Sequence, residues 1–248
     1  SLNLPAGIAG VQPQLGFSYN SMAGDGYMGT GWSISGTSVI SRCPKNLSSD
    51  NLQGNIAFSQ ADRLCLNGQR LISGTGSSDI GVSDATYWSA VTYHTELESF
   101  VKVKPHGTTT QGPKAYTVET KSGEIHYYGD VSQVSGSDDR SVSMALSLLN
   151  TSGASESSAD AVFELNGQTT PRMWALKAIR DVKGNYILFK YAEDQVKGEH
   201  YLTEVQYTGR PGQSPFAKVV FTNRDNKKKR IGYQAGHPVS ITTILDSV

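Results

Sequence analysis

Four glutamates are the carboxylates whose spacing could support acid–base chemistry. Glu96 and Glu98 stand two residues apart, and Glu119 and Glu124 flank a short turn. Paired carboxylates hydrolyse glycosidic bonds when they share a cleft, one as acid and the other as base or nucleophile. In a strand, however, Leu97 faces the core and the carboxylates of Glu96 and Glu98 face water. We therefore predict a solvated strand there, and nothing in the sequence places any of the four in a cleft.

Histidine, cysteine and serine offer no stronger catalytic or metal-binding pattern. No two histidines have metal-ligand spacing, the cysteines form no C-x-x-C motif, and no G-x-S-x-G elbow is present. The sequence thus predicts no catalytic, cofactor-binding or metal-binding residue, and no cofactor. The five histidines are His94, His106, His126, His200 and His237.

The two cysteines allow two interpretations. A bond between Cys43 and Cys65 would close a loop for which a disulfide contributes roughly 3 kcal/mol. The alternative is a pair of small buried thiols, which we favour because disulfides need an oxidising compartment.

The charge balance argues against nucleic acid and anionic membranes as partners. The chain has 22 basic and 22 acidic residues and a formal net charge of zero, so it lacks a strong field to attract either one. The one basic cluster is Lys227, Lys228 and Lys229 between Arg224 and Arg230, which we interpret as a solvated hairpin turn.

No apolar run is long enough to span a membrane, and no basic-then-apolar leader stands at the start. We expect neither a membrane span nor a secretion signal of its own. Because the chain starts at Ser1 and stops inside a strand-like run at residues 240–248, we expect a fragment of a longer protein, monomeric by itself.

The elements that would position these side chains are short strands joined by turns. Leu15, Phe17 and Tyr19 alternate with small or polar residues, as do Trp32 and Ile34, which indicates half-buried strands. Between them, Gly29 and Gly31 mark tight turns or close backbone approaches. We interpret Trp32, Trp88 and Trp174 as large core residues. Two of them exposed in one groove would instead favour sugar binding.

Three hairpins are predicted from turn chemistry. Asn67-Gly68 is the strongest signal, because both residues tolerate positive φ. Gly123 ends a turn between residues 116–120 and 124–128, and a turn with Asp181, Gly184 and Asn185 joins residues 174–180 to 186–191.

These features predict an all-β fold of many short antiparallel strands and hairpins, in a sandwich-like or open-barrel arrangement. Two long Ser/Gly-rich stretches, residues 73–86 and 131–160, are expected to be surface loops, and residues 141–149 are the one candidate helix longer than two turns. We expect one domain over residues 1–248, with a split near 131–160 as the alternative.

The order of several motifs resembles a known family. Residues 13–20 read P-x-L-x-x-x-Y-N, residues 29–36 read G-x-G-W-S-I-S-G, and an I-x-R motif ends at Arg42. Together they resemble the N-terminal module of the SpvB/TcaC family, the B components of insecticidal toxin complexes and related Rhs-type bacterial toxins. Further matching segments are residues 62–71, 93–100, 120–129, 174–176, 179–181, 184–185, 207–208 and 233–236.

The resemblance implies a non-enzymatic scaffold in a large secreted bacterial toxin, within a shell that houses or delivers a C-terminal effector. Its implied partners are propeller and Rhs-repeat regions of the same polypeptide and toxin-complex components. Some relatives end in an ADP-ribosyltransferase that modifies actin, but that chemistry needs an arginine upstream of a Ser-Thr-Ser strand. Here Arg42 follows the only comparable hydroxyl cluster, at residues 35–38. A carbohydrate-binding or adhesive β-sandwich and a hydrolase with a dispersed site are the alternatives.

Overall fold

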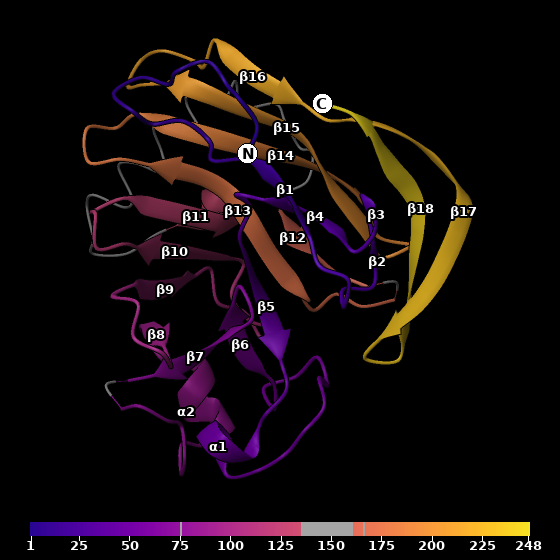
Figure 1. Ribbon diagram of the computed structural model, residues 1–248. Coiled ribbons are helices and arrows are strands. Elements are labelled where there is room, and N and C mark those ends of the chain that lie inside the picture. The colour runs from indigo at the N-terminus through magenta and orange to yellow at the C-terminus, as the bar shows by residue number, and fades with distance from the viewer. Residues whose placement is uncertain (75, 135–160, 166) are drawn as a thin grey trace.

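The computed structural model describes residues 1–74, 76–134, 161–165 and 167–248. Its centre is an antiparallel β-barrel (Figure 1). The barrel is closed because β13 pairs with β5 through residues 173–175 and with β11 through residues 176–180. Its eight strands are β5 (Val39–Cys43), β6 (Arg63–Leu66), β7 (Gln69–Ser73), β8 (Tyr93–Thr95), β9 (Lys102–His106), β10 (Ala115–Glu119), β11 (Ile125–Gly129) and β13 (Met173–Arg180).

Further strands extend and cover the barrel. β13 also pairs through residues 178–180 with β14 (Tyr186–Asp194), from which the sheet continues to β15 (Glu199–Gly209) and β16 (Ala217–Val220). The short strand β12 (Val162–Phe163) pairs with the start of β13. The all-β prediction is confirmed. In Figure 1 the N-terminal strands lie across the front of this sheet, and the C-terminal ribbon curves along one side. These are β1 (Gly16–Tyr19), β2 (Asp25–Gly26), β3 (Gly29–Thr30), β4 (Trp32–Ser35), β17 (Thr222–Gln234) and β18 (His237–Ser247).

The helices are short and lie at one end of the barrel, beside β6 and β7 (Figure 1). They are α1 (Leu47–Asp50) and α2 (Asp84–Trp88), and one 3₁₀ turn covers Val131–Gln133. No described helix has the length and apolar character to cross a bilayer. The helix expected at residues 141–149 lies outside the described residues, as does nearly all of the serine-rich stretch.

The three predicted hairpins are confirmed. Asn67 and Gly68 both have positive φ between β6 and β7, and Gly123 has positive φ between β10 and β11. In the turn between β13 and β14, the Asp181 carboxylate accepts hydrogen bonds from the backbone N–H groups of Lys183 and Asn185 and from the Asn185 amide. Gly184 supplies the positive φ that completes this turn.

Alternate side chains of β14 point to opposite faces of the strand and pack in two separate hydrophobic cores. Ile187, Phe189 and Tyr191 belong to the main hydrophobic core, whereas Leu188 belongs to a second, smaller cluster. Trp174 is fully buried in the main core, and its Nε1 donates to the carbonyl of Pro113 at 3.0 Å. Its ring meets Tyr116 edge to face, with 5.0 Å between the ring centroids.

The glycines of the N-terminal segment have the predicted backbone role. Gly29 and Gly31 both have positive φ. A Cβ at Gly31 would lie 2.7 Å from a ring carbon of Tyr19 and 2.9 Å from the carbonyl oxygen of Asn20. Only glycine fits there without a shift of the β1–β4 ribbon.

Candidate functional site

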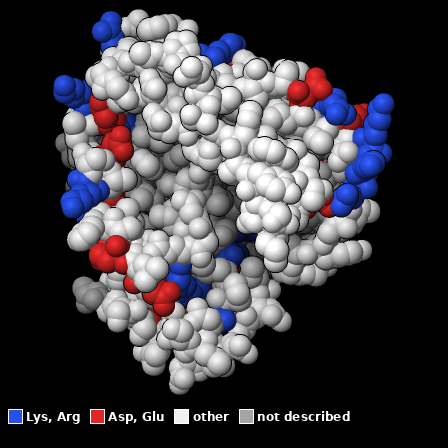
Figure 2. Space-filling view, viewed as in Figure 1, with Lys and Arg blue, Asp and Glu red and all other residues white. Residues whose placement is uncertain are grey.

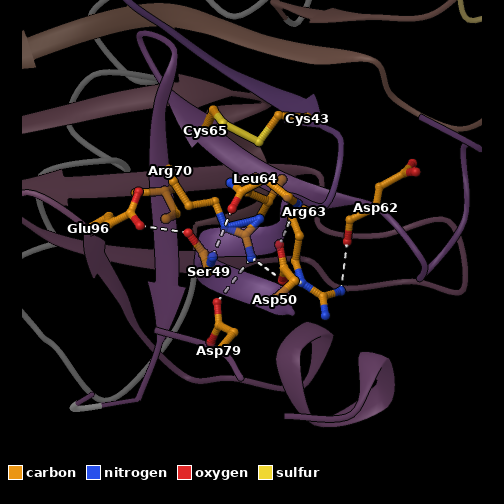
Figure 3. The surroundings of a disulfide bond; sticks show 12 residues. Cys43, Ser49, Asp50, Asp62, Arg63, Leu64, Cys65, Arg70, Asp79 and Glu96 are labelled. Atoms are coloured by element: carbon orange, nitrogen blue, oxygen red, sulfur yellow. Dashed lines mark hydrogen bonds and ion pairs between the residues drawn. A yellow bond between two sulfur atoms is a disulfide. The ribbon is translucent and has the colours of Figure 1, made fainter. Parts of the chain in front are cut away.

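A buried cluster of arginines and aspartates lies at the end of the barrel that carries the helices (Figure 3). The Asp50 carboxylate accepts from Arg63 Nε at 2.9 Å and from Arg70 Nη2 at 2.7 Å. Arg70 also pairs with Asp79, and Arg63 with Asp84. The guanidinium groups of Arg63 and Arg70 lie 4.5 and 5.4 Å from the ring centroid of Tyr87. We call these residues, with Tyr87, the arginine cluster.

The disulfide borders the arginine cluster. Cys43 of β5 and Cys65 of β6 are bonded, with their Cα atoms 5.9 Å apart, so the favoured prediction of two free thiols is wrong. Figure 3 shows the bond on neighbouring strands beside Arg63 and Arg70. The stretch expected to be a surface loop, residues 73–86, contributes the buried Asp79, whose carboxylate accepts from the backbone N–H of Ser73.

Arg42 holds several loops together. Its guanidinium pairs with Asp62 and donates to the carbonyls of Pro171, Ser59 and Gln111. Its charge lies 4.7 Å from the ring centroid of Trp88. Burial lowers the pKa of Arg42, and the Asp62 carboxylate opposes that shift. Because these donors are committed to other segments, Arg42 has a structural role, like the arginine cluster.

A second candidate site is an open groove of ≈ 440 Å³ between the N-terminal strands and the sheet of β13, β14 and β15. Trp32 lines it, together with Tyr27, Tyr201 and His200. Trp32 is 46% exposed, so the prediction that it is a core residue is wrong. Trp88 and Trp174 are buried as predicted, so the condition set for sugar binding, two tryptophans exposed in one groove, is not met. Trp32 differs because β4 pairs with β1 in a two-stranded ribbon, which leaves one face open.

The imidazole of His200 is fixed at the base of this groove. Arg172 Nη2 donates to His200 Nδ1 at 3.1 Å, and the ring stacks on Phe163 with 4.2 Å between centroids. Because a guanidinium can only donate, Nδ1 is the acceptor and the proton of the neutral ring is on Nε2. Burial first, and the charge of Arg172 second, lower the pKa of His200 to about 3.

This lowered pKa predicts acid sensitivity. The His200 pKa is about 3 in the folded chain and about 6.5 when unfolded, so the unfolded chain binds more protons between these values. Stability should therefore fall as the pH drops from about 6.5 toward 3. We expect His200→Asn, which retains an acceptor for Arg172, to lose less stability over this range in urea titrations. An NMR titration midpoint for His200 near its ordinary value would contradict the prediction.

A comparison with protein families matches residues 1–242 to the family described as "SpvB: Salmonella virulence plasmid 65kDa B protein". The chain belongs to the SpvB family. Among solved structures, the N-terminal domain of effector protein SpvB from Salmonella typhimurium strain LT2 is 15% identical with a TM-score of 0.65. That match covers 96% of this chain and 82% of the Salmonella chain.

Two larger toxin assemblies contain the same fold. The TcdB2-TccC3 structure is 18% identical with a TM-score of 0.59, and the match covers 98% of this chain and 13% of the TcdB2-TccC3 chain. The Photorhabdus luminescens Tc holotoxin pore is 15% identical with a TM-score of 0.58, over 94% and 12% of the respective chains. No curated protein sequence matches.

Two predicted surface features of this SpvB-family chain are corrected. Strand β8 ends at Thr95, before the predicted Glu96–Leu97–Glu98 strand. Leu97 is exposed and does not face the core, and the Glu96 carboxylate accepts a hydrogen bond from the Ser49 hydroxyl at 2.6 Å. The lysine-rich segment lies within β17, where a register shift makes it bulge, and the ribbon turns later, at residues 235–236. Figure 2 shows Lys and Arg gathered at that edge.

Sequence reasoning missed the arginine cluster and the groove of this SpvB-family chain. Arginine at positions 63 and 70 of two predicted strands was a signal, but Asp50 and Asp79 come from intervening segments without a recognisable motif. No three His, Cys, Asp or Glu side chains in the described part of the chain are placed to hold a metal ion.

Proposed function

We propose that this chain is a non-catalytic wall module of a bacterial toxin component that is secreted or delivered to a host. The observation that carries the proposal is the fold match to TcdB2-TccC3, in which 98% of this chain corresponds to 13% of a much longer one. Its partners would be the remaining regions of its own polypeptide, including propeller and Rhs-repeat regions, and other toxin-complex components.

Physical features of the barrel support a wall role. Closure by β13 removes the open edges of the barrel sheet, and the disulfide and arginine cluster brace one end of it. On the N-terminal ribbon, Phe17 and Tyr19 are large, exposed aromatic side chains. Adjacent exposed apolar side chains of this kind mark surfaces that neighbouring protein covers.

The test compares this chain alone with the same residues inside a full-length toxin component. We expect backbone amides of β1 and β4 to exchange hydrogen more slowly in the full-length protein, because other regions cover the ribbon. Amides of β10 and β11 serve as the internal control and should be unchanged. Equal exchange of the ribbon in both proteins would contradict the wall role.

A second measurement addresses catalysis. The isolated chain should neither release nicotinamide from NAD nor transfer a label from NAD to actin, with an active ADP-ribosyltransferase as the positive control. Turnover by this chain above the enzyme-free rate would overturn the non-catalytic assignment.

A further inference from the structure

The groove beside Trp32 has an uncharged lining. Its polar side chains are serine, threonine, asparagine, tyrosine and the neutral His200, set among apolar and aromatic groups. Figure 2 shows the surface over the N-terminal strands largely free of charged residues. Its volume lies within the range of small-molecule sites. A charged ligand would lose its hydration there without finding a counter-ion, so the groove suits an uncharged one.

Aromatic surfaces flank this groove. The Trp32 indole leans on Tyr19 with 5.2 Å between ring centroids and an interplanar angle of 51°. Tyr27 and Tyr201 stack in parallel, with 5.3 Å between ring centroids. The Tyr27 hydroxyl is anchored to the side chain of Asn223. The rings are therefore held in place before any ligand arrives.

Two hydrogen-bond donors that line the groove, one on His200 and one on Asn67, are oriented by contacts with neighbouring residues. Arg172, 4% exposed, and Phe163 fix the His200 ring, whose protonated Nε2 has no hydrogen bond to another described residue. Asn67 accepts from the Ser38 hydroxyl and the Val39 N–H through its Oδ1, both at 2.9 Å. Its amide nitrogen therefore remains available as a donor.

We propose that this groove binds a neutral saccharide of one or two rings. A sugar presents apolar C–H faces that pack on aromatic rings, and its hydroxyl oxygens accept hydrogen bonds from fixed donors such as His200 Nε2–H and the Asn67 amide. An extended peptide would instead seek backbone partners at a strand edge, whereas the fixed donors here are side chains. Trp32 and the exposed Tyr19 are paired on the same ribbon, so this inference concerns the chain by itself and is tested on it, separately from the exchange test of the wall role.

The experiment titrates the chain with maltose, cellobiose, lactose and N,N′-diacetylchitobiose. Trp32 is the only exposed tryptophan of the three, so binding should shift the tryptophan emission to shorter wavelength in a saturable way. Calorimetry should show affinity about tenfold weaker for Trp32→Ala, and similarly for His200→Asn, which keeps the acceptor for Arg172 but loses the Nε2–H donor. Tyr233→Ala, at an exposed aromatic side chain of β17 outside the groove, is the matched control and should bind normally.

Circular dichroism should show that each variant is folded before it is compared. The proposal is overturned if none of the four sugars binds at millimolar concentration, or if Trp32→Ala and His200→Asn bind as well as Tyr233→Ala. Selection of apolar peptides from a random library, blocked by Trp32→Ala and not by the sugars, would assign the groove to a protein partner instead.

Discussion

Replacing Asp50 with alanine should destabilise the fold by about 3–5 kcal/mol, the range found when one partner of a buried ion pair is removed. The Asp50 carboxylate is 2% exposed and serves two arginines at once. Arg70 already has two guanidinium nitrogens, Nε and Nη1, without a hydrogen-bond partner among the described residues. Without Asp50, its buried charge would depend on Asp79 alone. Urea unfolding followed by circular dichroism measures the loss.

The matched control is Asp246→Ala. Asp246 pairs with Arg224 at the surface, where both side chains are about half exposed. Exposed pairs contribute about 0–1 kcal/mol, so this variant should unfold almost as the parent does. Similar losses for Asp50→Ala and Asp246→Ala would show that the arginine cluster does not stabilise the barrel end.

Removing the disulfide should lower the free energy of unfolding by about 3 kcal/mol. The bond joins residues separated by 22 positions, and cross-linking a loop of this length reduces the conformational entropy of the unfolded chain by that amount. The double variant Cys43→Ala and Cys65→Ala should therefore unfold at lower urea concentration, with the same strand content in circular dichroism.

Dithiothreitol provides the control for the disulfide experiment. The reductant should destabilise the parent chain by a similar amount and leave the double variant unchanged, since that variant has no cysteine left. If the parent and the double variant were equally stable under oxidising conditions, the bond would have no measurable role.

Structural features that depend only on residues close together in the chain could be predicted from the sequence. The hairpins at Asn67-Gly68 and at residues 181–185 depend on positive φ and on short side-chain-to-backbone bonds, all within a few positions. The all-β class followed from the same local patterns, and the alternation of Ile187, Phe189 and Tyr191 indicated one shared face.

Features that depend on distant segments could not be predicted. Whether Trp32 is covered depends on what packs over a two-stranded ribbon, and alternation cannot specify that. The partnership of His200 with Arg172 and that of Arg70 with Asp50 and Asp79 join residues 9 to 28 positions apart, with no motif to link them. The Cys43–Cys65 bond required knowledge of strand pairing, since β5 and β6 place the two residues on neighbouring strands.

The closing strand β13 has a consequence for biosynthesis. β5 ends at Cys43, yet its barrel neighbour β13 begins only at Met173. At the usual translation rate of roughly 5–20 residues per second, β5 is without this partner for roughly 7 to 26 seconds of synthesis. During that interval β5 and β11 are unpaired edge strands of the nascent sheet and can aggregate. We therefore expect chaperones that shield incomplete sheets to bind while β13 is still being synthesised.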